Sequence, residues 1–195
     1  MAYYATIDDV RKRGFPPPSP TDNEIEFALG MSMEMIDLWC GMRFEKQNVV
    51  EISVDGNNGD RMIFGNKIEF VHSLTIDGNE IPAESIVNYI ENNNGEIALK
   101  DGYIFREGRK NVVLSCSTGF NEVPYAIREA SAHLSAMILN RQIFAGKPEV
   151  PELKSESLLD YSRTGFSYKE INGIIEQDTY LYGLLRPYRL KGAGV

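Results

Sequence analysis

The middle of the chain carries a series of short β-type segments that is flanked on both sides by helical patterns. From residue 47 to residue 117, runs rich in β-branched and aromatic residues alternate with turns built from Gly, Asn and Asp. The turns are too short to hold crossover helices, so the strands are predicted to pair antiparallel. The expected strands are Val49–Val54, Arg61–Phe64, Ile68–Ile76, Ser85–Ile90, Glu96–Leu99, Tyr103–Phe105 and Asn111–Ser117, and a further turn is expected over Glu107–Asn111.

Two helices are predicted before this β-region. The sequences TIDD at residues 6–9 and TDNE at residues 21–24 have the three-residue spacing of a capped helix start. The first helix is short and ends at Gly14. The second extends from about residue 22 to residue 40, with apolar side chains at helical steps, and Gly41 suits a left-handed stop.

A corner containing Gly119 and Asn121 ends the β-region, and a long amphipathic helix starts at about Pro124. One face of this helix is apolar, and it carries Ile127, Ala130, Leu134, Met137 and Ile138. A helix with one buried face on each side of the β-region predicts that the two helices pack together. The predicted fold class is therefore α+β, a helical bundle with an inserted antiparallel β-region.

The C-terminal part is predicted to be an extended arm followed by short helices and a basic tail. Residues 171–185 fit one or two short helices, interrupted near Gly173 or Gly183. Four parts are expected along the chain: N-terminal helices over 1–46, the inserted β-region over 47–118, the central helix over 119–145, and the arm, short helices and tail over 146–195.

The overall charge argues against broad contact with nucleic acid. The formal net charge is −8, whereas a protein that grips a phosphate backbone needs clustered Lys and Arg. No stretch approaches the roughly 20 apolar residues of a membrane span, and charged residues occupy the place of a secretory apolar segment. We expect a soluble protein that is not secreted by that route.

The sequence offers little catalytic chemistry. Cys40 and Cys116 lie far apart and without metal-ligand spacing, so both are expected to be reduced and buried. His72 and His133 have no neighbouring ligands at metal-binding spacing and are interpreted as structural. Ser117 is not in a nucleophile elbow, and its hydroxyl is interpreted as closing a turn. We therefore expect no enzyme, no cofactor and no metal.

A binding role for the β-region is the alternative hypothesis. Tyr89, Tyr103 and Phe105 would form the platform of a small-molecule or carbohydrate-binding module if their rings shared one exposed face.

The order of features along the chain resembles the head-tail connector, or adaptor, proteins of tailed bacteriophages, in particular the longer members with a β-insertion. The resemblance covers nearly the whole chain. It rests on YATIDDVRKRG near the N-terminus, TDNEIEFALGMSMEMIDLWCGMRF, GFNEVPYAIREASAHLSAMILN, SESLLDYS at Ser155–Ser162 and LLRPYR at Leu184–Arg189.

The resemblance implies a structural virion protein of the neck that forms a ring, usually a dodecamer, beneath the portal. Its partners would be the portal protein, copies of itself, the next neck or tail protein, and DNA that passes through the channel without sequence-specific binding. It would be assembled in the host bacterial cytoplasm. An acidic channel wall would let packaged DNA slide.

The resemblance also implies two contact segments in the C-terminal part. The portal-binding tail would comprise Leu184, Leu185, Arg186, Pro187, Tyr188 and Arg189, with the apolar residues as anchors and the arginines paired with acidic portal groups. An arm centred on Leu158, Leu159 and Tyr161 would lie along a neighbouring subunit. For both segments, packing within the same chain is the open alternative.

Overall fold

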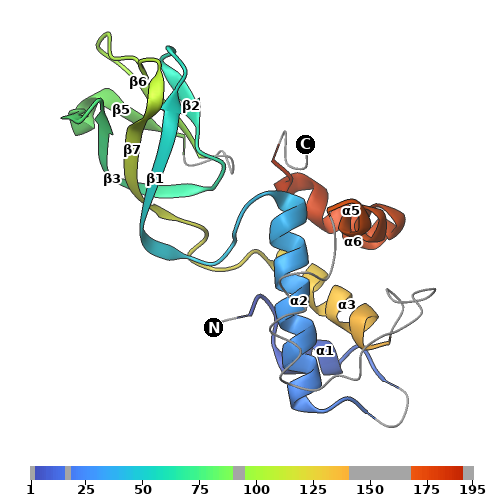
Figure 1. Cartoon of the computed structure of the whole chain (residues 1–195). Helices are drawn as coiled ribbons and strands as arrows, with labels where there is room; N and C mark the ends of the chain where they lie inside the picture. The colour runs from blue at the N-terminus through green and yellow to red at the C-terminus, as the bar shows by residue number, and fades with distance from the viewer. Residues whose placement is uncertain (1–2, 16–18, 90–94, 141–167, 191–195) are drawn as a thin grey trace. The chain divides into compact units, whose positions relative to one another are not determined.

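The protein folds as two compact units, and the second unit is inserted into the first. The computed structural model describes residues 3–15, 19–89, 95–140 and 168–190. One unit combines Met1–Cys40 with Val123–Val195 and is helical, whereas the other comprises Gly41–Glu122 and is built from β-strands. Figure 1 shows the elements of each unit. The predicted α+β class, with a β-region inserted between helices, is confirmed.

The helical unit is organised around two long helices. Helix α2 packs against α3, and α1, α5 and α6 contact this pair (Figure 1). The elements are α1 (Ile7–Arg11), α2 (Asp22–Cys40), α3 (Tyr125–Leu139), α5 (Tyr168–Gln177), α6 (Thr179–Leu185) and the 3-10 turn η3 (Arg186–Tyr188). Among the residues that the structure describes, no helix is both long enough and apolar enough to cross a membrane.

Buried hydroxyl groups join α2 to α3. The hydroxyl oxygen of Ser32 lies 2.8 Å from that of Ser131 and 3.0 Å from that of Ser135. Ser32 also donates to the carbonyl of Leu29, and Ser135 to that of Ser131. All three serines are fully buried. Because each hydroxyl has partners, the helices can approach through small residues without leaving a polar group unsatisfied.

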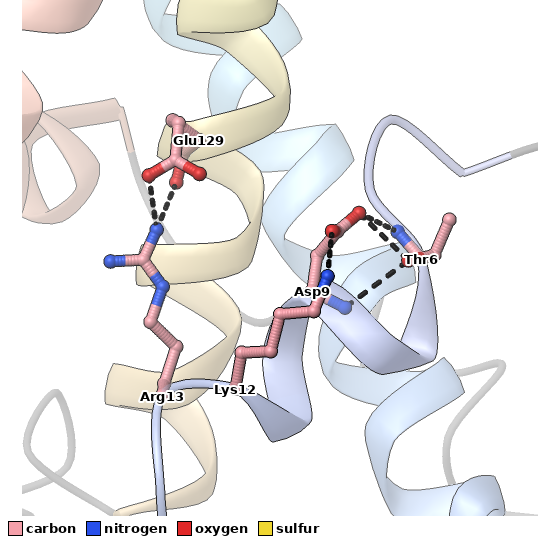
Figure 2. Close-up of polar contacts among 5 residues, drawn as sticks. All are labelled: Thr6, Asp9, Lys12, Arg13 and Glu129. Carbon is pink, nitrogen blue, oxygen red and sulfur yellow. Dashed lines mark hydrogen bonds and ion pairs between the residues drawn. The ribbon is translucent and has the colours of Figure 1, made fainter.

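The helix starts follow the predicted capping pattern. Thr6 accepts from the backbone N–H of Asp9, and the Asp9 carboxylate accepts from the Thr6 hydroxyl and backbone N–H (Figure 2). These hydrogen bonds lower the pKa of Asp9 below its ordinary value. Thr21 and Glu24 repeat the arrangement before α2. Figure 2 also shows Arg13, just after α1, paired with Glu129 of α3.

The β unit contains two antiparallel sheets. One sheet has the order β1-β7-β3-β4 and the other has the order β2-β6-β5. Figure 1 labels all of these strands except β4. A single apolar cluster includes Phe64, Leu74, Ile97, Phe105 and Leu114, and so draws on both sheets. The strands are β1 (Gln47–Gly56), β2 (Arg61–Ile63), β3 (Ile68–Ile76), β4 (Asn79–Glu80), β5 (Ile86–Asn88), β6 (Glu96–Leu99) and β7 (Gly108–Thr118), with a 3-10 turn η1 at Ala83–Ser85.

Two sequence predictions for this unit were wrong. Residues 103–105 form no strand, and only Phe105 makes an isolated bridge, to Gly59, because its ring is drawn into the core. Residues 107–111 are not a hairpin turn. The segment Gly108–Asn111 instead begins β7, and Lys110 with a φ of 47° marks an irregularity where β7 leaves its regular register with β1.

The entry and exit of the β unit are held side by side. The rings of Phe44 and Phe120 stack with centroids 5.6 Å apart, and the Phe120 N–H donates to the carbonyl of Phe44. Lys46 binds both Glu69 and Asn121, and Asn121 donates to Glu69. We call these five residues the stem. The β unit as a whole spans Gly41–Glu122, whereas the β-region was expected over 47–118.

The stem requires a glycine at position 119. Its φ is +88°, and a Cβ atom there would lie 2.2 Å from the carbonyl oxygen of Glu45. Its N–H donates to the carbonyl of Lys67. The corner therefore needs both the left-handed backbone and the absence of a side chain.

Substituting Gly119 with Ala should destabilise the β unit by more than the roughly 1 kcal/mol expected of a left-handed alanine alone. The excess arises because the main chain of Glu45 cannot move without opening the stem. Urea denaturation followed by circular dichroism measures the difference. Gly65→Ala is the matched control, since Gly65 has a φ of +81° and open space around it. An equal loss of unfolding free energy in Gly119→Ala and Gly65→Ala would contradict the steric argument.

Candidate functional site

The C-terminal helices form a small layer on the helical unit. Of the one or two helices expected, two are present, and the break between α5 and α6 falls at Asp178 and not at a glycine. Gly173 lies within α5 and Gly183 within α6. Asp178 ends one helix and caps the next, because its Oδ1 accepts from the backbone N–H groups of Tyr180 at 2.9 Å and Leu181 at 3.0 Å.

Asp178 also fixes this layer to α3. Its Oδ2 lies 3.1 Å from Nε2 of His133. Burial alone would raise the pKa of Asp178, but the hydrogen bonds from Leu181, His133 and Tyr180, together with the charge of His133, outweigh burial and lower that pKa. The ring of Tyr180 packs edge-on against His133, with centroids 5.2 Å apart. His133 therefore has the structural role predicted for it.

The tail folds back over the C-terminal end of α2. The Arg189 guanidinium lies 4.7 Å from the centroid of the fully buried Trp39 ring. Arg189 also binds Glu176 and Asn172, each at 3.2 Å, and Asn172 accepts from the Trp39 indole N–H at 2.9 Å. The ring of Tyr182 meets Trp39 edge-on at 6.1 Å. A single aromatic residue thus collects contacts from α5, α6 and the tail.

The last described residue completes the end of α2. The backbone N–H of Leu190 donates to the carbonyl of Cys40 at 2.9 Å. Helix C-termini leave such carbonyls without intrahelical partners, so the tail serves as a cap. Burial, with the charge of Asp37 adding to it, raises the pKa of the Cys40 thiol far above its ordinary value. Burial likewise raises the pKa of Cys116 to about 11. Both cysteines are free and buried, as predicted.

The predicted tail residues fall into two groups. Leu185 is fully buried within its own chain, and Arg189 is committed to Trp39, Asn172 and Glu176. Arg186 and Pro187 are exposed, while Leu184 and Tyr188 are half-buried. Packing within the same chain thus holds Leu185 and Arg189 most firmly, and the exposed Arg186 lies over the ring of Tyr182, 5.8 Å from its centroid. Leu158, Leu159 and Tyr161 of the predicted arm lie outside the described residues.

Ser117 has a different role from the one predicted. It lies within β7 and closes no turn, because β7 continues to Thr118. Its hydroxyl donates to the carbonyl of Asn48 in β1, and its oxygen lies 2.9 Å from Nε2 of His72 in β3. His72 Nε2 also lies 3.1 Å from the Asn48 carbonyl. Since an N–H at this position satisfies both oxygens, the group ties three strands together and does not activate the serine.

The aromatic platform of the alternative hypothesis does not form. Phe105 is fully buried in the core, Tyr103 is partly exposed, and Tyr89 is half-buried with Arg61 over its ring. Within the described ranges, no three His, Cys, Asp or Glu side chains come together in a way that could hold a metal ion.

The Trp39 and Asp178 contacts were missed by sequence reasoning. Arg189 follows Trp39 by 150 residues in the sequence, so no local pattern connects the two. Asp178 carries a local signal, since an Asp before Thr-Tyr-Leu suits a helix N-cap. The glycines on either side obscured that signal.

Comparison with known proteins gives matches in structure alone. The sequence matches no protein-family model and no curated protein. Three chains of similar structure come from the neck of an empty GTA particle computed with C6 symmetry, the neck of a native GTA particle computed with C12 symmetry, and the virion of a native gene transfer agent (GTA) particle.

The likeness extends over most of each chain. The TM-scores are 0.55, 0.53 and 0.54, at 12%, 12% and 11% identity. The matches cover 84%, 83% and 84% of this chain and 91%, 89% and 91% of the other chains. The chain therefore shares its fold with chains of GTA particles, two of which are described as necks.

Replacing Asp178 with Ala should cost about 1 kcal/mol of unfolding free energy near neutral pH through loss of the cap. The pKa of Asp178 is lower in the folded protein than in the unfolded chain. Asp178 therefore stabilises the fold fully at pH values above its pKa in the unfolded chain, and this stabilisation is lost as the pH falls through its pKa in the folded protein. The difference from wild type should therefore shrink in acid. Urea titrations at several pH values test this, and Asp178→Asn, which keeps a capping oxygen, should lose less than Asp178→Ala. A pH-independent difference would contradict the assignment.

Replacing Arg189 with Ala should expose Trp39, and because this is the only tryptophan, its fluorescence reports the change directly. We expect a red-shifted emission maximum and increased quenching by acrylamide. Arg186→Ala is the matched control, because Arg186 lies over Tyr182 and is exposed. An unchanged spectrum in Arg189→Ala would show that the tail does not cover the indole in solution.

Proposed function

We propose that the protein is a structural component of the neck of a tailed-phage-type particle, where it forms a ring beneath the portal. The observation that carries this proposal is the shared fold, which covers 84% of this chain and 91% of a chain in a GTA particle neck. The resemblance to head-tail connectors, which rests on the residues, supports the same role. The protein joins the DNA-filled capsid to the tail, and its activity is assembly, not catalysis.

The ring consists of identical copies, and the C6 and C12 symmetries of the similar necks support a dodecamer. The portal acts as a template that raises the local concentration of subunits. Neighbouring copies then associate without a strong pairwise interface, because each is already held beside the next. The arm around Leu158, Leu159 and Tyr161 is proposed to lie along a neighbouring copy.

The exposed part of the tail makes the contact with the portal. Arg186 and Pro187 are the residues most open to a partner, with Leu184 and Tyr188 beside them. Leu185 and Arg189 hold this surface in place, because Leu185 is buried in the helical unit and Arg189 packs on Trp39. Arg186 pairs with an acidic portal group, as arginine is among the residues that dominate interface energies.

DNA passes through the ring without being held. The charge of −8 supports this, and α2 carries Asp or Glu at five positions and neither Lys nor Arg. Acidic side chains repel the phosphate backbone, so contact with the duplex stays weak. The protein is located in the virion neck, also contacts the next neck or tail protein, and is assembled in the host cytoplasm.

Reversing the charge of Arg186 tests the portal contact. Arg186→Glu should weaken binding to the purified portal by about tenfold or more, because an attractive pair becomes a repulsive one. Ring complexes are counted by electron microscopy, and affinity is measured by calorimetry. Removing the whole tail would be less informative, since Leu185 and Arg189 belong to the helical core.

Arg109→Glu is the matched control, because Arg109 is an exposed arginine of β7 in the other unit. It should assemble like wild type. Normal assembly of Arg186→Glu would exclude the tail as the portal contact. Failure of the wild-type protein to form any ring with its portal would exclude the proposed function itself.

A further inference from the structure

A cavity of about 420 Å³ lies in the β unit between two Asp-Gly turns. Its lining includes Ile76 and Ile81, which are buried, and Tyr103, which is partly exposed. Asp77, Asp101 and Arg106 supply its charged groups. A mostly apolar cavity with a few converging polar groups is the usual form of a small-ligand site.

The two carboxylates are fixed in place before any ligand arrives. Asp77 and Asp101 both adopt left-handed backbone conformations, with φ of 53° and 59°. Oδ1 of Asp77 accepts from the Asn111 amide at 3.0 Å, and Oδ2 of Asp101 accepts from the Ser85 hydroxyl at 2.9 Å. Among the described residues, the second oxygen of each carboxylate has no such partner. Each aspartate thus presents one held and one available oxygen.

The charge pattern selects among ligand classes. A phosphate would face two carboxylates against one guanidinium, which disfavours it. A cationic side chain would be attracted by the two carboxylates but would also meet the charge of Arg106. A metal ion would need a third ligand, and no such group forms within the residues described. Neutral hydroxyl groups suit both kinds of charge, because each one can donate to a carboxylate and accept from a guanidinium.

We propose that this cavity binds a neutral saccharide of one or two rings. Sugar hydroxyls donate to the available oxygens of Asp77 and Asp101 and accept from Arg106. The apolar face of the sugar ring lies against Tyr103, whose ring combines apolar area with a polar tip. The site differs from the aromatic platform considered from the sequence, because Phe105 is buried and takes no part. All residues of the site belong to the β unit, and the portal contact is proposed for the tail of the other unit, so the two proposals can fail separately.

The test is a glycan array probed with the full-length protein, followed by calorimetric titration with the best free saccharide. Asp101→Asn keeps an acceptor for Ser85 but removes the charge, and Tyr103→Ala removes the ring. Each should weaken binding by about tenfold, consistent with the loss of one charged hydrogen bond or one aromatic contact. Glu51→Gln, an acid-to-amide change on exposed β1, is the matched control and should bind like wild type.

Specific saccharide binding that both site variants lose and Glu51→Gln retains supports the proposal. No binding at millimolar concentrations of any arrayed saccharide overturns it. Binding of tetralysine that Asp101→Asn abolishes also overturns it, because that result assigns the cavity to a cationic segment of a protein partner. Circular dichroism spectra of the variants establish that the fold is retained.

Discussion

The inserted β unit depends on bringing its first and last residues together. Helices α2 and α3 pack against each other, so the chain that leaves after Cys40 must return at Val123. The stem meets this requirement by stacking Phe44 on Phe120 and by joining Lys46, Glu69 and Asn121. Gly119 permits the close approach, since any side chain there would meet the backbone of Glu45. The stem thereby allows one chain to form two compact units, each with its own core.

The helical unit uses Trp39 as its second organising point. Contacts from α5, α6 and the tail all converge on the end of α2, and the tail also supplies the cap for its last carbonyl. A C-terminal segment held in this way keeps part of its surface, chiefly Arg186 and Pro187, in a defined position. The proposed docking surface would therefore be preorganised, so less ordering would be needed when a partner binds.

Local signals in the sequence predicted the fold well, and long-range contacts were beyond them. The threonine caps, the end of α2 at Cys40 and the strands Ile68–Ile76 and Glu96–Leu99 follow from capping and periodicity, which act over a few residues. The start of β7 was misassigned because Gly108 and Lys110 resemble turn residues, yet pairing with β1 overrides that preference. The cavity needed two turns at positions 77 and 101 to meet, which only tertiary structure determines.

The burial of both thiols has a practical consequence for studying assembly. Alkylating reagents attack the thiolate, and Cys40 and Cys116 are enclosed and remain protonated near neutral pH. A cysteine introduced at an exposed position would therefore be the only one to react with a maleimide dye under native conditions. Neither native cysteine would need to be replaced, so fluorescently labelled subunits could report on incorporation into a particle without disturbing either core.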